Sequence, residues 1–164
     1  MRTYESFLTL CAELDGDLVE LERVARHNLK AWERIGAGAS DPVDWGALGF
    51  TLQTLYGVLE GYFLRVSKFF ESGLPSEAWH KALVEKMSLD IPGLRPPLLT
   101  SPELRRQVLE LLKFRHRIRN LYGEDLDPGK TALVERITLE IMASFPSIHK
   151  EFLAKLMAIA EAAK

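Results

Sequence analysis

The sequence predicts an all-α protein, an antiparallel bundle of about four to five helices. Apolar residues recur at steps of three and four along most of the chain, which is the spacing of one helix face. Turns rich in proline and glycine separate these segments, and no segment shows the apolar–polar alternation of a β-strand. Because the chain has 164 residues and 47% of them are hydrophobic, we expect a single helical domain over residues 1–164.

The first two predicted helices are long. The first ends at Ile35, because the glycines of the segment 36–38 that follows are a natural helix stop. The second begins after Asp41, since an aspartate N-cap followed by Pro42 is typical of a helix start, and it ends before Gly73. Their apolar stripes are Phe7, Leu10, Leu14, Leu18, Leu21, Ala25, Leu29, Trp32 and Ile35, then Trp45, Leu48, Leu52, Leu55, Leu59, Phe63, Val66 and Phe70.

A short third helix and a basic fourth helix follow. The third is expected to open at Pro75 and to run to Met87. Residues 90–101 contain too many prolines and glycines for regular structure, so they are expected to form a loop. The pair Ser101-Pro102 then starts the basic helix, again as an N-cap followed by proline.

The last helix is expected to begin at Asp127-Pro128 and to run toward Ala160. Pro146 lies within this segment. Because proline has no backbone N–H and its ring clashes with the preceding turn, a kink or a break is expected there.

Several classes of function are disfavoured by what the sequence lacks. Cys11 is the only cysteine, so neither a disulfide framework nor a cysteine-based zinc site is expected. The four histidines have no partner at three or four residues' distance, and no glycine-rich phosphate loop follows a strand, so we expect neither a metal nor another cofactor. The first residues lack a signal peptide's apolar run and no stretch is long enough to span a membrane, which favours a cytoplasmic protein.

The charge is concentrated in one helix. The net charge is −2, but the segment from Arg105 to Arg119 holds six Lys/Arg residues and one acid, Glu110, for a local charge of +5. A positive stripe on an otherwise acidic body is a possible RNA-binding site. The alternative is a solvated helix face whose cations pair with acids from neighbouring helices.

Arg115 interrupts the apolar stripe of this basic helix. A guanidinium is always charged, and burying it unpaired costs several kcal/mol or more. Arg115 should therefore meet a carboxylate, a subunit interface or a phosphate. Glu60, within an apolar run of the second helix, is a possible partner for Arg115 or Arg119, and exposure at the surface is the alternative. The stripe consists of Leu104, Val108, Leu111, Arg115, Ile118 and Tyr122.

The same segment carries groups suited to RNA cleavage without a metal. Attack of the ribose 2′-hydroxyl on the adjacent phosphorus requires a cation that matches phosphate and a group that titrates near neutrality. Arg115 and Arg119 are one helical turn apart, and Tyr122 follows on that face. His116 and Asn120 form a second pair, rotated by about 100° from the first.

These residues resemble the active-site motif of a known family. The pattern Arg115-His116-x-x-x-Asn120-x-Tyr122 is similar to the Arg-Asn-x-x-x-His-x-Tyr motif of the HEPN superfamily, in its HepT-like branch of ribonuclease toxins. The resemblance covers most of the chain from about residue 45. Further similar segments are Leu52 to Glu60, Trp79-His80, Ile91 to Pro96, and Leu126-Asp127-Pro128.

The resemblance implies a HEPN-like homodimer whose two motif copies form a cleft that cuts RNA without metal. Many relatives are toxins encoded beside an MNT-like nucleotidyltransferase antitoxin, which in some cases transfers AMP to the motif tyrosine. Carried over, Arg115 would stabilise the phosphorane, and Tyr122 would position the RNA and be the adenylylation target. The hypothesis assigns RNA contacts to Lys113, Arg117 and Arg119.

The sequence departs from the family motif at the catalytic histidine. The motif's histidine position is Asn120 here, and an amide cannot shuttle a proton at physiological pH. The leading hypothesis is therefore an endoribonuclease in which His116 supplies acid–base chemistry while Asn120 and Tyr122 position the RNA. One alternative is a catalytically inactive adaptor that binds RNA or a nucleotidyltransferase. Another is a structural bundle whose basic helix pairs with acids of the same protein.

Overall fold

The computed structural model describes residues 2–71, 73, 77–121 and 123–162. These residues form five helices, and their only β-type pairing is one bridge between Ile91 and Arg95, which confirms the all-α prediction. In the described ranges, no helix is both long and apolar enough to cross a membrane. The helices are α1 (Tyr4–Gly36), α2 (Pro42–Phe70), α3 (Trp79–Met87), α4 (Pro102–Arg119) and α5 (Pro128–Ala162).

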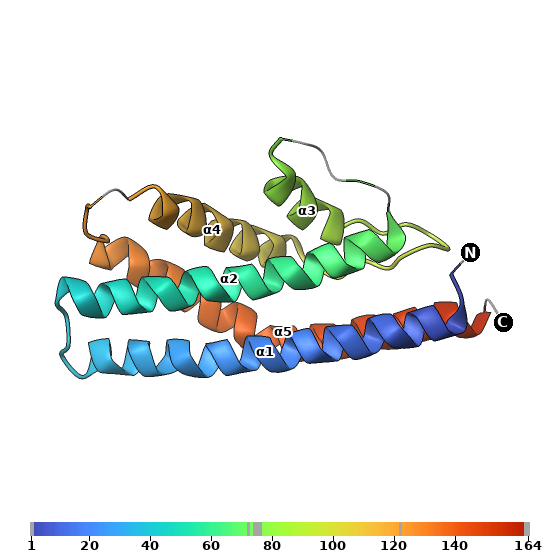
Figure 1. Cartoon of the computed structure of the whole chain (residues 1–164), viewed down its shortest axis with the longest axis horizontal. Coiled ribbons are helices and arrows are strands. Elements are labelled where there is room, and N and C mark those ends of the chain that lie inside the picture. The colour runs from blue at the N-terminus through green and yellow to red at the C-terminus, as the bar shows by residue number, and fades with distance from the viewer. Residues whose placement is uncertain (1, 72, 74–76, 122, 163–164) are drawn as a thin grey trace.

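The four longer helices form an antiparallel bundle (Figure 1). Helix α1 packs against α2 and α5, and α4 packs against the same two helices from the other side. The short helix α3 covers α2 and α4. Both termini lie at one end of the bundle, while the α1–α2 and α4–α5 connections lie at the other (Figure 1). This arrangement brings α3 and α4 onto one face of α2, although both are distant in sequence from the middle of α2.

Side-chain caps fix three of the predicted helix starts. Asp41 accepts hydrogen bonds from two backbone N–H groups of the first turn of α2, at 2.9 and 3.0 Å. Ser101 accepts one at 3.0 Å in α4, and Asp127 accepts one at 2.9 Å in α5. Each cap satisfies N–H groups that have no partner within the helix. The predicted starts at Asp41, Ser101 and Asp127 are therefore confirmed.

Two predicted helix bounds are wrong. Helix α3 begins at Trp79 rather than at Pro75, because Ala78 takes a left-handed conformation (φ 53°) that a right-handed helix does not contain. Pro75 itself is outside the described residues. Helix α4 ends at Arg119, with Asn120 as its C-cap, so it does not continue to Tyr122. Tyr122 also lies outside the described residues.

Pro146 does not break α5. The helix continues through it to Ala162, although its axis changes direction along its length (Figure 1). Phe145 immediately before the proline and Phe152 after it are both buried. Packing of both halves against the bundle therefore holds the helix together across the missing hydrogen bond.

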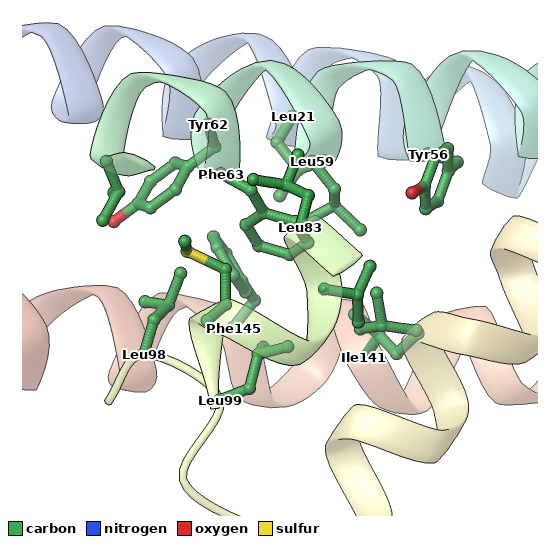
Figure 2. Packing of buried hydrophobic residues seen from close by; sticks show 14 of the residues in the cluster. Leu21, Tyr56, Leu59, Tyr62, Phe63, Leu83, Leu98, Leu99, Ile141 and Phe145 are labelled. Atoms are coloured by element: carbon green, nitrogen blue, oxygen red, sulfur yellow. The ribbon is translucent and has the colours of Figure 1, made fainter. Parts of the chain in front are cut away.

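Aromatic and aliphatic side chains from all five helices share one core. Figure 2 shows Tyr62 and Phe63 of α2 near Phe145 of α5 and Leu83 of α3. The rings of Tyr62 and Phe145 meet edge to face, with centroids 5.3 Å apart. Each such side chain, when fully buried, contributes roughly 1.5–3 kcal/mol to stability. This core fixes the relative positions of α2, α3 and α5 beneath the polar site described below.

A buried polar network joins α1 to the rest of the bundle. Leu29, expected on the apolar stripe of α1, is 45% exposed, and the preceding residue, Asn28, is buried in its place. The Asn28 amide donates to Glu135 Oε2 at 2.7 Å and to Thr51 Oγ1 at 3.1 Å. Glu135 is fully buried, and this burial raises its carboxyl pKa to about 7. Three helices are thus linked through one titratable group.

A second buried cluster holds the end of α3. The fully buried guanidinium of Arg95 donates from Nη2 to Glu71 Oε1 at 3.0 Å and to the carbonyl oxygen of Lys86 at 2.8 Å. The ammonium group of Lys86 contacts the other carboxylate oxygen of Glu71 at 2.5 Å. Because Glu71 caps α2 and Lys86 lies in the last turn of α3, this cluster fixes α3 against α2.

Candidate functional site

Arg115 lies on the packed face of α4, as its position in the apolar stripe predicts. Only 17% of its side chain is exposed, and its guanidinium carbon lies 5.3 Å from the centre of the Tyr56 ring on α2. Burial of Tyr56 raises the pKa of its hydroxyl, and the negative charge of Glu60 raises that pKa further. Tyr56 therefore stays neutral, and the face of its ring contacts the Arg115 guanidinium in a cation–π interaction.

Glu60 of α2 is the partner of Arg115. Its Oε1 atom accepts a hydrogen bond from Arg115 Nη1 at 2.9 Å, and the residue is only 6% exposed. The predicted pairing of these two residues across the bundle is confirmed, so the guanidinium charge is compensated within one subunit. Among the described residues, the Nε and Nη2 atoms of Arg115 have no hydrogen-bond partner. One side of the guanidinium thus remains available for another acceptor.

The second carboxylate oxygen of Glu60 binds His80 of α3. Glu60 Oε2 lies 2.6 Å from His80 Nδ1. Because an ionised carboxylate only accepts hydrogen bonds, Nδ1 carries the proton and Nε2 is left for other contacts. The His80 ring also stacks on Trp79, with centroids 3.7 Å apart and planes at 28°. The orientation of this histidine is therefore fixed on two sides.

Helices α3 and α4 bring two histidines together. The rings of His80 and His116 meet edge to face, with centroids 5.5 Å apart. Partial desolvation lowers the pKa of His116, which is an exposed residue, and the neighbouring positive charges of His80, Arg115 and Arg119 lower it further. His116 is therefore mostly neutral at pH 7, which is the form that accepts a proton. The sequence identified His116 but not this partner.

Asn120 takes part in ending α4. Its side-chain amide donates to the carbonyl oxygen of His116 at 2.9 Å, and the residue is the exposed C-cap of the helix. The bond satisfies one of the carbonyl groups that lack a partner in the last turn. The amide is thus engaged with the backbone of the same helix end that presents His116.

A cleft lies between α3 and α4, with a volume of about 870 Å³. Both His80 and His116 line it. On α4, Arg105, Leu109, Leu112 and His116 follow one another at steps of four, three and four, so they occupy one helix face. This spacing was present in the sequence and could have indicated the cleft. The charged residues that line it are Lys81, Glu103, Arg105, Arg106, Glu110 and Lys113.

The cations in the cleft are only partly neutralised. Arg106 pairs with Glu103, and Lys113 pairs with Glu110 at 2.6 Å, in both cases within one turn of α4. In the described part of the chain, Arg105 has no ion pair. Lys81 pairs with Glu85 of its own helix at 3.7 Å, outside the cleft lining, so four Lys/Arg and two glutamates line the cleft and leave a positive surface beside the two histidines.

The three predicted RNA contacts do not share one surface. Lys113 lines the cleft. Arg117 instead lines a separate hollow of about 230 Å³, together with the acidic residues Glu124, Asp125 and Asp127. Arg119 lines neither of these hollows, although its charge acts on His116. Of the three, only Lys113 is placed together with the histidine pair.

Other titratable groups lie elsewhere in the bundle. His27 is exposed on α1, and His149 is buried between Tyr62 and Asp15 at 2.9 and 2.8 Å. Cys11 is buried, which raises the pKa of its thiol. Across the residues that the structure describes, no group of three or more His, Cys, Asp or Glu side chains could hold a metal ion. His80 and His116 are thus the histidines that share a cleft.

Comparison with known proteins agrees with the sequence resemblance. A family model described as HepT-like protein matches residues 47–156, which include most of α2, all of α3 and α4, and most of α5. Searches of curated proteins and of solved structures found no match. The matched segment is well over half of the chain and contains Glu60, His80, Arg115 and His116. The chain therefore belongs to the HepT-like family, a branch of the HEPN superfamily.

Proposed function

We propose that this protein is a metal-independent endoribonuclease, the toxin of a toxin–antitoxin pair. The observation that carries the proposal is the placement of His80 and His116 at a positively charged cleft, with Arg115 held next to His80 by their shared partner Glu60. Membership of the HepT-like family supports the same reaction class. RNA would bind along α4 through its phosphates, and cleavage would take place next to the histidines.

Each proposed role follows from the chemistry of the group. Arg115 keeps Nε and Nη2 available to stabilise the non-bridging oxygens of the phosphorane, while Glu60 fixes its orientation. Neutral His116 accepts the proton of the 2′-hydroxyl. Asn120 and Tyr122 are proposed as positioning groups, and Tyr122 as the adenylylation target. The exposed cations Lys113, Arg117 and Arg119 are proposed to contact the RNA backbone.

The cellular setting belongs to the proposal as well. Family membership supports a homodimer and a nucleotidyltransferase antitoxin of the MNT type as partners. We place the protein in the cytoplasm, where its RNA substrate and this antitoxin would be found. We also keep residues 1–164 as one domain, since α1 contributes to the same hydrophobic core as the matched segment.

Cleavage of RNA in the presence of EDTA tests the enzyme directly. Purified wild-type protein is expected to cut total RNA and to leave 2′,3′-cyclic phosphate ends. The Arg115→Ala variant is expected to lose cleavage, because it lacks the cation that faces the phosphorane. Arg23→Ala, which removes an exposed arginine of α1, serves as the matched control and should cleave normally. Intact RNA after incubation with folded wild-type protein would exclude the nuclease.

The second candidate function is an inactive adaptor that binds RNA or the nucleotidyltransferase. Two observations favour it: Glu60 already neutralises Arg115, and Asn120 replaces the histidine of the family motif. An adaptor would bind RNA without cutting it, with an affinity that falls steeply as salt is raised. Asn120→His separates the two readings further, because a gain of cleavage would mean that the natural chain lacks its proton shuttle.

A further inference from the structure

We infer that His80 of α3 is the second catalytic residue of this site and donates the proton to the leaving oxygen. The inference rests on the proposed ribonuclease function and identifies a group outside the basic helix. His80 lines the same cleft as His116, and the two rings are 5.5 Å apart. Within one subunit the α4 motif offers one histidine, whereas cleavage needs both a proton acceptor and a proton donor.

The surroundings of His80 suit a proton donor. Glu60 binds Nδ1 at 2.6 Å, so the ring presents Nε2 as the atom that exchanges a proton. A carboxylate in this place orients the imidazole and compensates the positive charge that the ring acquires when it is protonated. Stacking on Trp79 removes rotational freedom from the ring. About a fifth of the side chain (21%) remains exposed toward solvent.

Glu60 couples the proton donor to the phosphate-binding group. Its two oxygens hold His80 and Arg115 at 2.6 and 2.9 Å, from helices α3 and α4. A buried carboxylate needs partners for both of its oxygens, and here these partners are the phosphate-binding Arg115 and the titratable His80. The bond to His80 places a second titratable group at the cleft. We therefore assign Glu60 as a positioning residue.

The reaction balances without a co-reactant. Neutral His116 takes the proton of the 2′-hydroxyl, and the 2′ oxygen forms a bond to phosphorus. The bond between phosphorus and the 5′ oxygen breaks, and protonated His80 gives its proton to that oxygen. The products are a 2′,3′-cyclic phosphate and a 5′-hydroxyl. His116 then loses a proton to water and His80 regains one, which restores the starting state.

The test uses the full-length protein and an RNA oligonucleotide that the wild type cuts at a mapped site. His80→Ala is expected to lower kcat/KM by about 10²–10⁴-fold, the usual loss for a missing acid or base. Glu60→Gln is expected to lower kcat by a smaller factor. His27→Ala, which removes an exposed histidine of α1, is the matched control and should cleave at the wild-type rate. Circular dichroism establishes that each variant is folded.

A substrate with sulfur in place of the bridging 5′ oxygen separates catalysis from folding. A thiolate leaves without prior protonation, because thiols are much more acidic than alcohols. His80→Ala should therefore cut the sulfur substrate at nearly the wild-type rate, whereas Glu60→Gln should recover only in part, because Glu60 also orients Arg115. His116→Ala should remain slow on both substrates, since it lacks the proton acceptor.

Each outcome decides the assignment. Recovery of the His80→Ala rate on the sulfur substrate supports His80 as the proton donor. Normal cleavage of the oxygen substrate by His80→Ala overturns this inference while the ribonuclease function stands. Equal loss on both substrates by folded His80→Ala assigns His80 a structural role and also overturns it. A wild-type protein that cuts no RNA overturns the proposed function, and the inference falls with it.

Discussion

Glu60 is a single carboxylate that accepts hydrogen bonds from two helices. Because Glu60 is buried, both bonds matter for the stability of the fold. Taking a charge out of water is costly unless it is paired and hydrogen-bonded. Here both oxygens are occupied, one by Arg115 and one by His80. Removing any one member leaves a buried polar group without its partner. Stability measurements on this trio can therefore be made independently of any activity.

Truncating either member of the Glu60–Arg115 pair should destabilise the protein. We expect Glu60→Ala and Arg115→Ala each to lower the free energy of unfolding by about 3 kcal/mol, because the remaining largely buried charge loses its partner in the ion pair. The double variant should lose clearly less than the sum of the two. Urea unfolding measures all four proteins. Arg23→Ala, from an exposed pair, should leave stability unchanged, and strictly additive losses would contradict the coupling.

The titration of His116 reports its contact with His80. Partial desolvation and neighbouring cations lower its pKa below the ordinary value of 6.5. His80→Ala should raise the pKa of His116 toward that value, because it opens the site and removes one positive neighbour. Proton NMR of the imidazole signals as a function of pH measures the change, with Arg23→Ala as a control. An unchanged His116 titration in His80→Ala would argue against the pair.

At this scale the sequence predicts Arg115 well, and the reason is physical. A charged residue on an apolar stripe must find a partner, and the sequence indicates Glu60 as a candidate because it too lies in an apolar run. His80 carries no such signal, since Glu60 and His116, which it contacts on two other helices, are distant from it in the sequence. Asn28 was missed for a different reason. The apolar pattern assigns leucine rather than asparagine to the core, so it predicts a buried Leu29, whereas Leu29 is exposed and Asn28 is buried.

At the scale of elements, short-range signals predict helix starts and fail at some ends. Asp41, Ser101 and Asp127 act through bonds to residues two or three positions away, so the local sequence contains the whole cause. The start of α3 lacks such a signal, and the end of α4 is marked only by Asn120, whose amide bonds to the His116 carbonyl oxygen. The meeting of α3 with α4 depends on the loop held by Arg95, which contacts α2 as well.

The N-cap of α4 gives a test at this scale. Ser101→Ala should lower the free energy of unfolding by about 1 kcal/mol, because the backbone N–H of Leu104 loses its acceptor. Thr100→Ala, the exposed neighbouring position, is the matched control and should have little effect. Thermal or urea unfolding of both variants measures the difference. A loss as large in Thr100→Ala as in Ser101→Ala would mean that the cap itself is unimportant.

The whole molecule depends on how α1 joins the segment that matches the HepT-like family. Most of α1 is amphipathic, and its apolar residues enter the shared core. Two polar contacts fix its register: His149 of α5 binds Asp15, and Glu135 of α5 binds Asn28. Buried polar groups that require one partner resist sliding of one helix along another. Protonation of Glu135 therefore affects the attachment of α1 to the bundle.

Glu135 should make the stability of the whole protein depend on pH. Burial raises its carboxyl pKa from 4.5 to about 7, so between these values the folded protein holds a proton that the unfolded chain releases. The contribution is fully present below pH 4.5 and is lost as the pH rises through 7. The difference of the two pKa values corresponds to about 3 kcal/mol.

Glu135→Gln keeps the acceptor for Asn28 and cannot ionise, so its stability should change much less between pH 5 and pH 8. Urea unfolding at a series of pH values measures this slope. Glu151→Gln, an exposed glutamate of the same helix, should keep the wild-type slope and controls for the change in net charge. If Glu135→Gln and the wild type lose stability in parallel above pH 6, the ionisation lies elsewhere. If only the wild type weakens, the link between α1 and α5 is held by the protonated form of one buried carboxyl group.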